Sequence, residues 1–94
     1  MPHTFVRLTV HDFDSWKPVM DNYAEMRREA ESLSTRIFRS VDEPNEVGVI
    51  VEWESLEKAR DFYDSLDQLA GMEKGGVLET SEMLYSDSVS TSEH

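Results

Sequence analysis

The order of strand-like and helix-like patterns along the chain constrains its fold more than any other feature. Strands are indicated where apolar residues alternate or β-branched residues run together, and helices where apolar residues recur every three or four positions. In chain order the patterns predict a strand, a helix, a hairpin of two strands, a second helix and a last strand. The expected ranges are 3–10, from about 14 to 31, 34–41, 47–54, from 55 to about 69, and 77–85. This β-α-β-β-α-β order is ferredoxin-like, an α+β fold in which two helices cover one face of a four-stranded antiparallel sheet.

Capping and turn residues support these boundaries. Asp12 or Asp14 can accept hydrogen bonds from the free N–H groups that begin the first helix, and Pro18 is tolerated in a first turn. The Pro-Asn pair at 44–45 favours a turn between the second and third strands, and Ser55 is expected to cap the second helix. The third strand is apolar on both faces, which predicts a central place in the sheet.

The length of 94 residues leaves room for one domain, which we expect over residues 1–85. Residues 86–94 are rich in serine, threonine and acidic side chains and are expected to form a disordered tail.

The sheet face away from the helices also needs cover. Phe38 must lie on it, together with either Leu84 or the pair Met83 and Tyr85. A monomer would leave these side chains in water. We therefore expect a homodimer in which two sheets pack face to face.

The composition excludes several classes of function. The net charge of −11 argues against nucleic-acid binding, and the lack of cysteine excludes disulfides, thiolate metal sites and cysteine nucleophiles. No apolar run approaches the roughly 20 residues of a membrane span. No secretory signal pattern precedes the first strand, so we expect a cytoplasmic protein with no membrane partner.

The acidic residues are spread along the whole chain, and the lysines are only Lys17, Lys58 and Lys74. This pattern is typical of a surface adapted to high salt, where self-repulsion is screened. An ordinary acidic bacterial protein would show the same excess.

Three segments carry a resemblance to a known family. These are D-F-D-S-W-K-P-V at 12–19, D-E-P-N-E-V at 42–47 and V-E-W-E-S-L-E-K-A at 51–59, together with the Gly-Gly-Val step at 75–77. Over residues 4–85 the sequence resembles the dimeric α/β-barrel superfamily, specifically small proteins of the antibiotic-biosynthesis-monooxygenase type. The resemblance implies a ligand site between the sheet and the helices. Members include cofactor-independent oxygenases of quinol-like aromatics, polyketide cyclases, haem-degrading enzymes and proteins of no known activity, so the fold does not choose among functions.

Three aromatic residues are candidates for lining such a site. Related oxygenases often carry a substrate-contacting tryptophan at the strand end that Trp53 occupies, and its indole can stack on a planar ring and donate one N–H. Trp16 and Tyr23 lie on the inward stripe of the first helix. All three residues could equally be core side chains.

Two further residues are candidates for catalysis. Arg7, in the middle of the first strand, could stabilise a phenolate, an enolate or a peroxy anion, or it could pair with Glu52 or a glutamate of the fourth strand. His3 could act as a general base because imidazole titrates near neutrality, or it could be a surface residue.

No cofactor or metal is expected. The haem-degrading relatives use a histidine on the second helix and an asparagine on the first strand, and this sequence has neither residue there. Two hypotheses remain. One is a cofactor-independent monooxygenase or cyclase-like enzyme acting on a small aromatic or polyketide-like molecule. The other is a non-catalytic small-molecule-binding or structural dimeric module.

Overall fold

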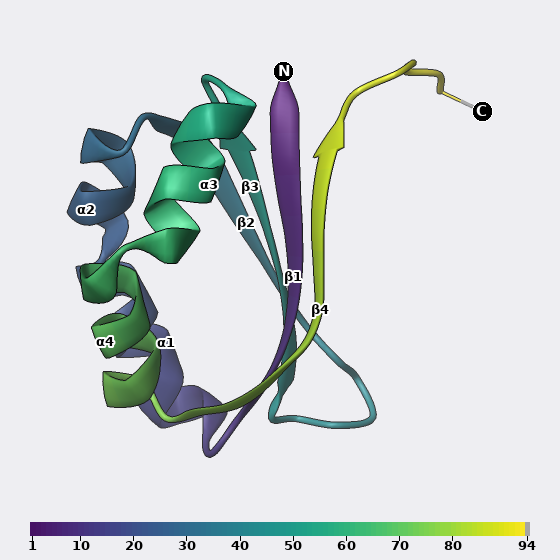
Figure 1. Ribbon diagram of the computed structural model, residues 1–94. Coiled ribbons are helices and arrows are strands. Elements are labelled where there is room, and N and C mark those ends of the chain that lie inside the picture. The colour runs from purple at the N-terminus through teal and green to yellow at the C-terminus, as the bar shows by residue number, and fades with distance from the viewer. Residues whose placement is uncertain (94) are drawn as a thin grey trace.

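The computed structural model describes residues 1–93 and consists of two layers, with all helices on one face of a single sheet (Figure 1). The elements in chain order are β1 (Pro2–Val10), α1 (Phe13–Asn22), α2 (Ala24–Glu29), β2 (Ser32–Arg39), β3 (Glu46–Trp53), α3 (Leu56–Asp64), α4 (Leu66–Lys74) and β4 (Val77–Asp87). The α+β ferredoxin-like fold class is therefore confirmed.

The sheet has the strand order β2-β3-β1-β4, and every neighbouring pair is antiparallel. Strand β3 is internal, as its apolar residues on both faces predict. Along β1 the side chains alternate between the two faces. Val6 and Leu8 are buried beneath the helices, whereas Phe5 and Arg7 are exposed on the other side. We call these the covered face and the open face.

Each expected helix is divided into two, which corrects the prediction of two continuous helices. The first breaks at Tyr23, which ends α1 and precedes α2. The second breaks at Ser65, whose hydroxyl donates to the Phe62 carbonyl (2.7 Å) and accepts from the Gln68 N–H (3.1 Å). A serine hydroxyl that caps a new helix competes with continuation of the old one. Leu66, which directly follows this break, is 83% exposed.

The predicted caps are present at the start of both helical segments. Asp12 accepts a hydrogen bond from the Ser15 N–H (3.1 Å), and Ser55 accepts one from the Lys58 N–H (3.2 Å). Pro18, however, lies beyond the first turn of α1, so one internal backbone hydrogen bond of that helix is absent.

The core lies between the covered face and the helices. It includes valines from β1 and β3, Trp16 from α1, Ala59 and Phe62 from α3, and the fully buried Trp53. Strand β4 ends at Asp87, and residues 88–93 form no helix or strand. Within the part of the chain that the structure describes, no helix is long and apolar enough to cross a membrane.

Candidate functional site

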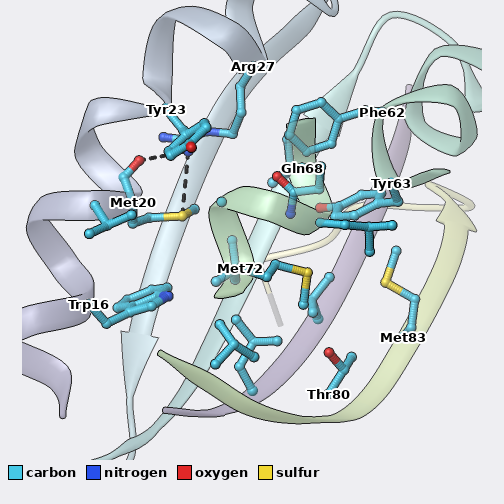
Figure 2. Close-up of a pocket in the computed structure, with 18 of the residues that line it drawn as sticks. Trp16, Met20, Tyr23, Arg27, Phe62, Tyr63, Gln68, Met72, Thr80 and Met83 are labelled. Atoms are coloured by element: carbon cyan, nitrogen blue, oxygen red, sulfur yellow. Dashed lines mark hydrogen bonds between the residues drawn. The ribbon is translucent and has the colours of Figure 1, made fainter. Parts of the chain in front are cut away.

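A cavity of about 310 Å³ lies between the covered face and the helices (Figure 2). Its floor is the sheet, through side chains such as Val6, Leu8 and Val49, and its roof is formed by side chains of all four helices. This volume is at the lower end of the range for small-molecule sites, and the mostly apolar wall with a few polar groups is also typical of them.

The exposed residues of the cavity wall indicate where it opens. Asp64 and Leu69, from the two helices that meet at Ser65, are exposed, and so is Thr80 on the edge strand β4. The opening therefore lies between the α3–α4 junction and β4. Asp64 gives this opening a negative charge.

Arg27 brings a positive charge into the cavity wall. It lies on α2, is only 7% exposed, and donates from Nη1 to the Met20 carbonyl (2.9 Å) and to Met20 Sδ (3.5 Å; dashed lines in Figure 2). Among residues 1–93 it forms no ion pair. Burial lowers the pKa of its guanidinium, partly offset by Tyr63 and Asp21. An arginine nevertheless stays charged at neutral pH, so this is a buried cation facing an apolar space.

A short hydrogen-bond chain supports the opposite side of the cavity. Trp53 Nε1 donates to Thr4 Oγ1 (3.0 Å), and Thr4 Oγ1 lies 3.1 Å from Tyr63 Oη. Thr4 and Trp53 are fully buried, whereas Tyr63 belongs to the cavity wall. Burial raises the pKa of the Tyr63 hydroxyl, so it is protonated at neutral pH.

Aromatic rings hold Tyr63 in place. Its ring makes edge-on contacts with Phe62, Trp53 and Tyr85, at centroid distances of 5.1, 5.9 and 6.3 Å. The Arg60 guanidinium lies over the Tyr85 ring at 4.5 Å. Edge-to-face contacts of this kind fix ring orientation in addition to burying area.

Of the three predicted lining residues, Trp16 and Tyr23 belong to the cavity wall. The Tyr23 ring rests on Gly71 of α4, where an added Cβ would lie only 3.0 Å from the ring. Trp53 is 0% exposed and lies behind the wall, which it supports through Thr4 and Tyr63.

The two predicted catalytic residues lie on the open face, away from this cavity. Arg7 donates to Glu46 through Nε (2.6 Å) and Nη2, and it pairs more loosely with Glu82 at 3.7 Å. Glu82 is the expected partner on the fourth strand, whereas the partner on β3 is Glu46 rather than Glu52. Glu52 instead lies 3.5 Å from His3 Nε2.

Sequence reasoning missed Arg27 and Tyr63 as functional candidates. Both stand on apolar helical stripes, where a helix presents side chains to the core. An arginine in such a stripe is the one signal that could have identified the site, because buried arginines without a partner are rare. Within residues 1–93 no three metal-binding side chains cluster together.

Comparison with known proteins finds similarity in structure. No family model and no curated protein matches the sequence. The cofactor-independent oxygenase SnoaB from Streptomyces nogalater superposes with a TM-score of 0.80 at 18% identity, over 99% of this chain and 98% of that chain. A candidate antibiotic biosynthesis monooxygenase from Bordetella bronchiseptica gives 0.78 at 15%, over 94% and 96%. Another, from Deinococcus radiodurans, gives 0.74 at 10%, over 100% and 98%.

These identities are low, so the likeness concerns the fold. Nearly the whole of each chain takes part in the superposition. The protein therefore has the fold of the antibiotic biosynthesis monooxygenase structures, which confirms the resemblance at the level of the fold.

Proposed function

We propose that the protein is a cofactor-independent oxygenase or cyclase-like enzyme that acts on a small aromatic or polyketide-like molecule in the cavity. The observation that carries this proposal is the buried guanidinium of Arg27, which pairs with no carboxylate of residues 1–93 and stands in a mostly apolar and aromatic wall. A fixed cation in a site of low dielectric stabilises negative charge that develops on a bound molecule. The structural likeness to SnoaB, itself a cofactor-independent oxygenase, supports the same reading.

In the oxygenase version, a ring CH₂ that is conjugated with a carbonyl, as in an anthrone, loses a proton and gives an enolate. Arg27 stabilises the enolate oxygen, and Asp64, which lies on the cavity wall, accepts the proton. The electron-rich carbon then reduces O₂ and forms a hydroperoxide. Loss of water from the hydroperoxide leaves a new carbonyl, so one O₂ is consumed for each CH₂ oxidised. Arg27 thus takes the role that the sequence suggested for Arg7.

The test is oxygen uptake with an anthrone that carries one free CH₂ group. We expect the protein to accelerate uptake with a stoichiometry of one O₂ per anthrone and a quinone product. Arg27→Met should remove the acceleration, and Arg7→Met, on the open face, is the matched control that should retain it. Uptake no faster than in protein-free buffer would contradict the enzymatic proposal.

The alternative is a non-catalytic small-molecule-binding module. It is favoured by one observation: among the described residues of the cavity wall there is no histidine, and the only carboxylate is Asp64. A module of this kind would bind the anthrone or its quinone without changing the rate of oxygen uptake. Equilibrium binding measured beside the uptake assay distinguishes the two.

We also propose that two chains pair through their open faces. Phe5, Phe38 and Leu84 are 41%, 45% and 56% exposed there, around the Arg7–Glu46–Glu82 ion pairs. These side chains line one shallow hollow of the open face, exposed apolar side chains grouped in this way are typical of an interface, and a two-fold contact would match each patch with its own copy. Because the chain carries a net charge of −11, such pairing should be favoured by salt.

Light scattering at micromolar concentration in molar KCl tests this pairing. We expect a dimer for the natural sequence and a monomer for Phe38→Asp, which places a charge in the interface. A monomer for the natural sequence in high salt would contradict the proposal. A melting curve against KCl, measured on the same samples, tests the proposed adaptation to high salt, which predicts a rising melting temperature.

A further inference from the structure

The hydrogen-bond chain behind the cavity has a direction. The indole N–H of Trp53 can only donate, so it occupies a lone pair of Thr4 Oγ1. The Thr4 hydroxyl still carries one proton, and its side chain is fully buried. Among residues 1–93 the other hydrogen-bond partner of Thr4 Oγ1 is Tyr63 Oη. A buried donor left unpaired is costly, so Thr4 donates its proton to the oxygen of Tyr63.

Because Thr4 is the donor in this pair, the hydroxyl proton of Tyr63 has no acceptor among residues 1–93. The hydroxyl end of Tyr63 faces the side of the cavity where Arg27 and Gln68 lie (Figure 2). We propose that Tyr63 donates this proton in a hydrogen bond to an oxygen of the bound molecule, with Thr4 and Trp53 as positioning residues. The inference rests on the proposed function, because it requires the cavity to hold a ligand.

Two donors then converge on the ligand. Arg27 supplies a charged N–H, and Tyr63 supplies a neutral O–H that is strengthened because its oxygen already accepts from Thr4. Arg27 and Tyr63 are close enough for each to affect the pKa of the other. Two such donors favour a molecule with a carbonyl, enol or phenol oxygen, and the mostly apolar and aromatic wall favours a planar ring. They also stabilise its deprotonated form more than its neutral form.

The test uses 4-nitrophenol, whose phenol and phenolate forms absorb at different wavelengths. A pH titration of the bound probe gives its pKa in the site. We expect this pKa to lie below that of the free probe, and Tyr63→Phe to raise it by about one unit through loss of one hydrogen bond to a charged oxygen. Thr9→Val is the control, because it also removes one hydroxyl, but from the open face of β1 and outside the cavity wall. It should leave the bound pKa unchanged.

The positioning role of Thr4 needs a second pair of variants. Thr4→Ser retains the hydroxyl and should retain the low pKa of the bound probe. Thr4→Val removes the hydroxyl at nearly constant shape, and it should raise the bound pKa by less than Tyr63→Phe does. A purely structural role for Thr4 would lower the melting temperature in Thr4→Val without moving the bound pKa.

Three outcomes separate the inferences. A lowered pKa in the natural protein that is the same in Tyr63→Phe would overturn the donor role of Tyr63 and leave the proposed function standing. A bound pKa in Thr4→Val equal to that of the natural protein would overturn the positioning role of Thr4. Absence of any binding by the natural protein would overturn both this inference and the proposed ligand site.

Discussion

Arg7 lies on the open face of the sheet and Arg27, on helix α2, lines the cavity at the covered face, and the two arginines have opposite surroundings. On the open face, Arg7 is half-exposed and held by Glu46 and Glu82. On the covered side, Arg27 is buried, its hydrogen bonds go to the backbone and sulfur of Met20, and no carboxylate within residues 1–93 pairs with it. An arginine that carboxylates already neutralise contributes little to the binding free energy of an anionic ligand. A buried arginine without such a partner contributes more, because the anion supplies the missing counter-charge. We therefore propose that the covered face carries the chemistry and that the open face carries the association of two chains.

The largest expected difference between the faces is in stability. Trp53→Ala should lower the free energy of unfolding by about 3–5 kcal/mol, because it empties a fully buried site and leaves Thr4 without its donor. Phe38→Ala on the open face should cost less than about 1 kcal/mol at concentrations where the chain is monomeric. Urea unfolding of both variants gives the comparison, and equal losses would show that the open face is as well packed as the core.

The next difference concerns anion binding. Arg27→Met should weaken the binding of 4-nitrophenolate by about tenfold or more, since a charge-assisted hydrogen bond is lost. Arg7→Met should leave the affinity unchanged. The stability of Arg27→Met should stay level or rise, because replacing a buried charge by an apolar side chain removes its desolvation cost. Calorimetric titration measures the affinities. A weaker affinity in Arg7→Met than in Arg27→Met would reverse the assignment of the two faces.

Two glycine-to-alanine substitutions, one at the cavity wall and one on the open face, compare the two faces by their effect on ligand affinity. In Gly71→Ala the new Cβ would lie 3.0–3.2 Å from the Tyr23 ring, so the ring must shift and alter the cavity wall. In Gly48→Ala, on the open face, the nearest atom is Phe38 Cβ at an ordinary 3.8 Å. We expect a loss of several-fold in ligand affinity for Gly71→Ala and none for Gly48→Ala. The better helix propensity of alanine should offset part of the strain in α4, so thermal melting should change little.

The smallest expected effect is on how the free energy of unfolding depends on pH in the alkaline range. This dependence reports how far the Tyr63 hydroxyl on the covered face is shielded from water. Burial raises the pKa of Tyr63 above its ordinary value of 10.0, so the unfolded chain releases this proton first as the pH rises. The free energy of unfolding should therefore fall above pH 10, with Tyr63 contributing at most about 1.4 kcal/mol per pH unit until its folded pKa is passed. Tyr63→Phe should show a shallower fall. Identical slopes would mean that Tyr63 is hydrated.

The sheet could be predicted from the sequence because its signals are local. Alternation in β1 and the β-branched run in β3 each identify a strand without reference to the rest of the chain. The helix breaks could not be predicted in the same way. Ser65 fits a helix interior by pattern, and only its two hydrogen bonds, to Phe62 and Gln68, show that it ends one helix and begins another.

The site was only partly predictable. The alternation that places Val6 and Leu8 beneath the helices also places Arg7 on the other face, so the period-two pattern itself argued against Arg7 as a cavity residue. The stripe that contains Trp16 and Tyr23 also contains Arg27, but whether such a stripe meets a solid core or a cavity depends on packing at the scale of single methyl groups. Composition does not determine whether the stripe meets a solid core or a cavity.

The central claim is that a ligand binds on the covered face, and methionine methyl NMR tests it most directly. Met20, Met72 and Met83 belong to the cavity wall, whereas Met1 and Met26 do not. With methyl-labelled methionine and 4-nitrophenol as the titrant, we predict concentration-dependent shifts of the three wall methyls and unchanged signals from the other two. Saturable binding that leaves the wall methyls unmoved would place the ligand elsewhere and contradict the account.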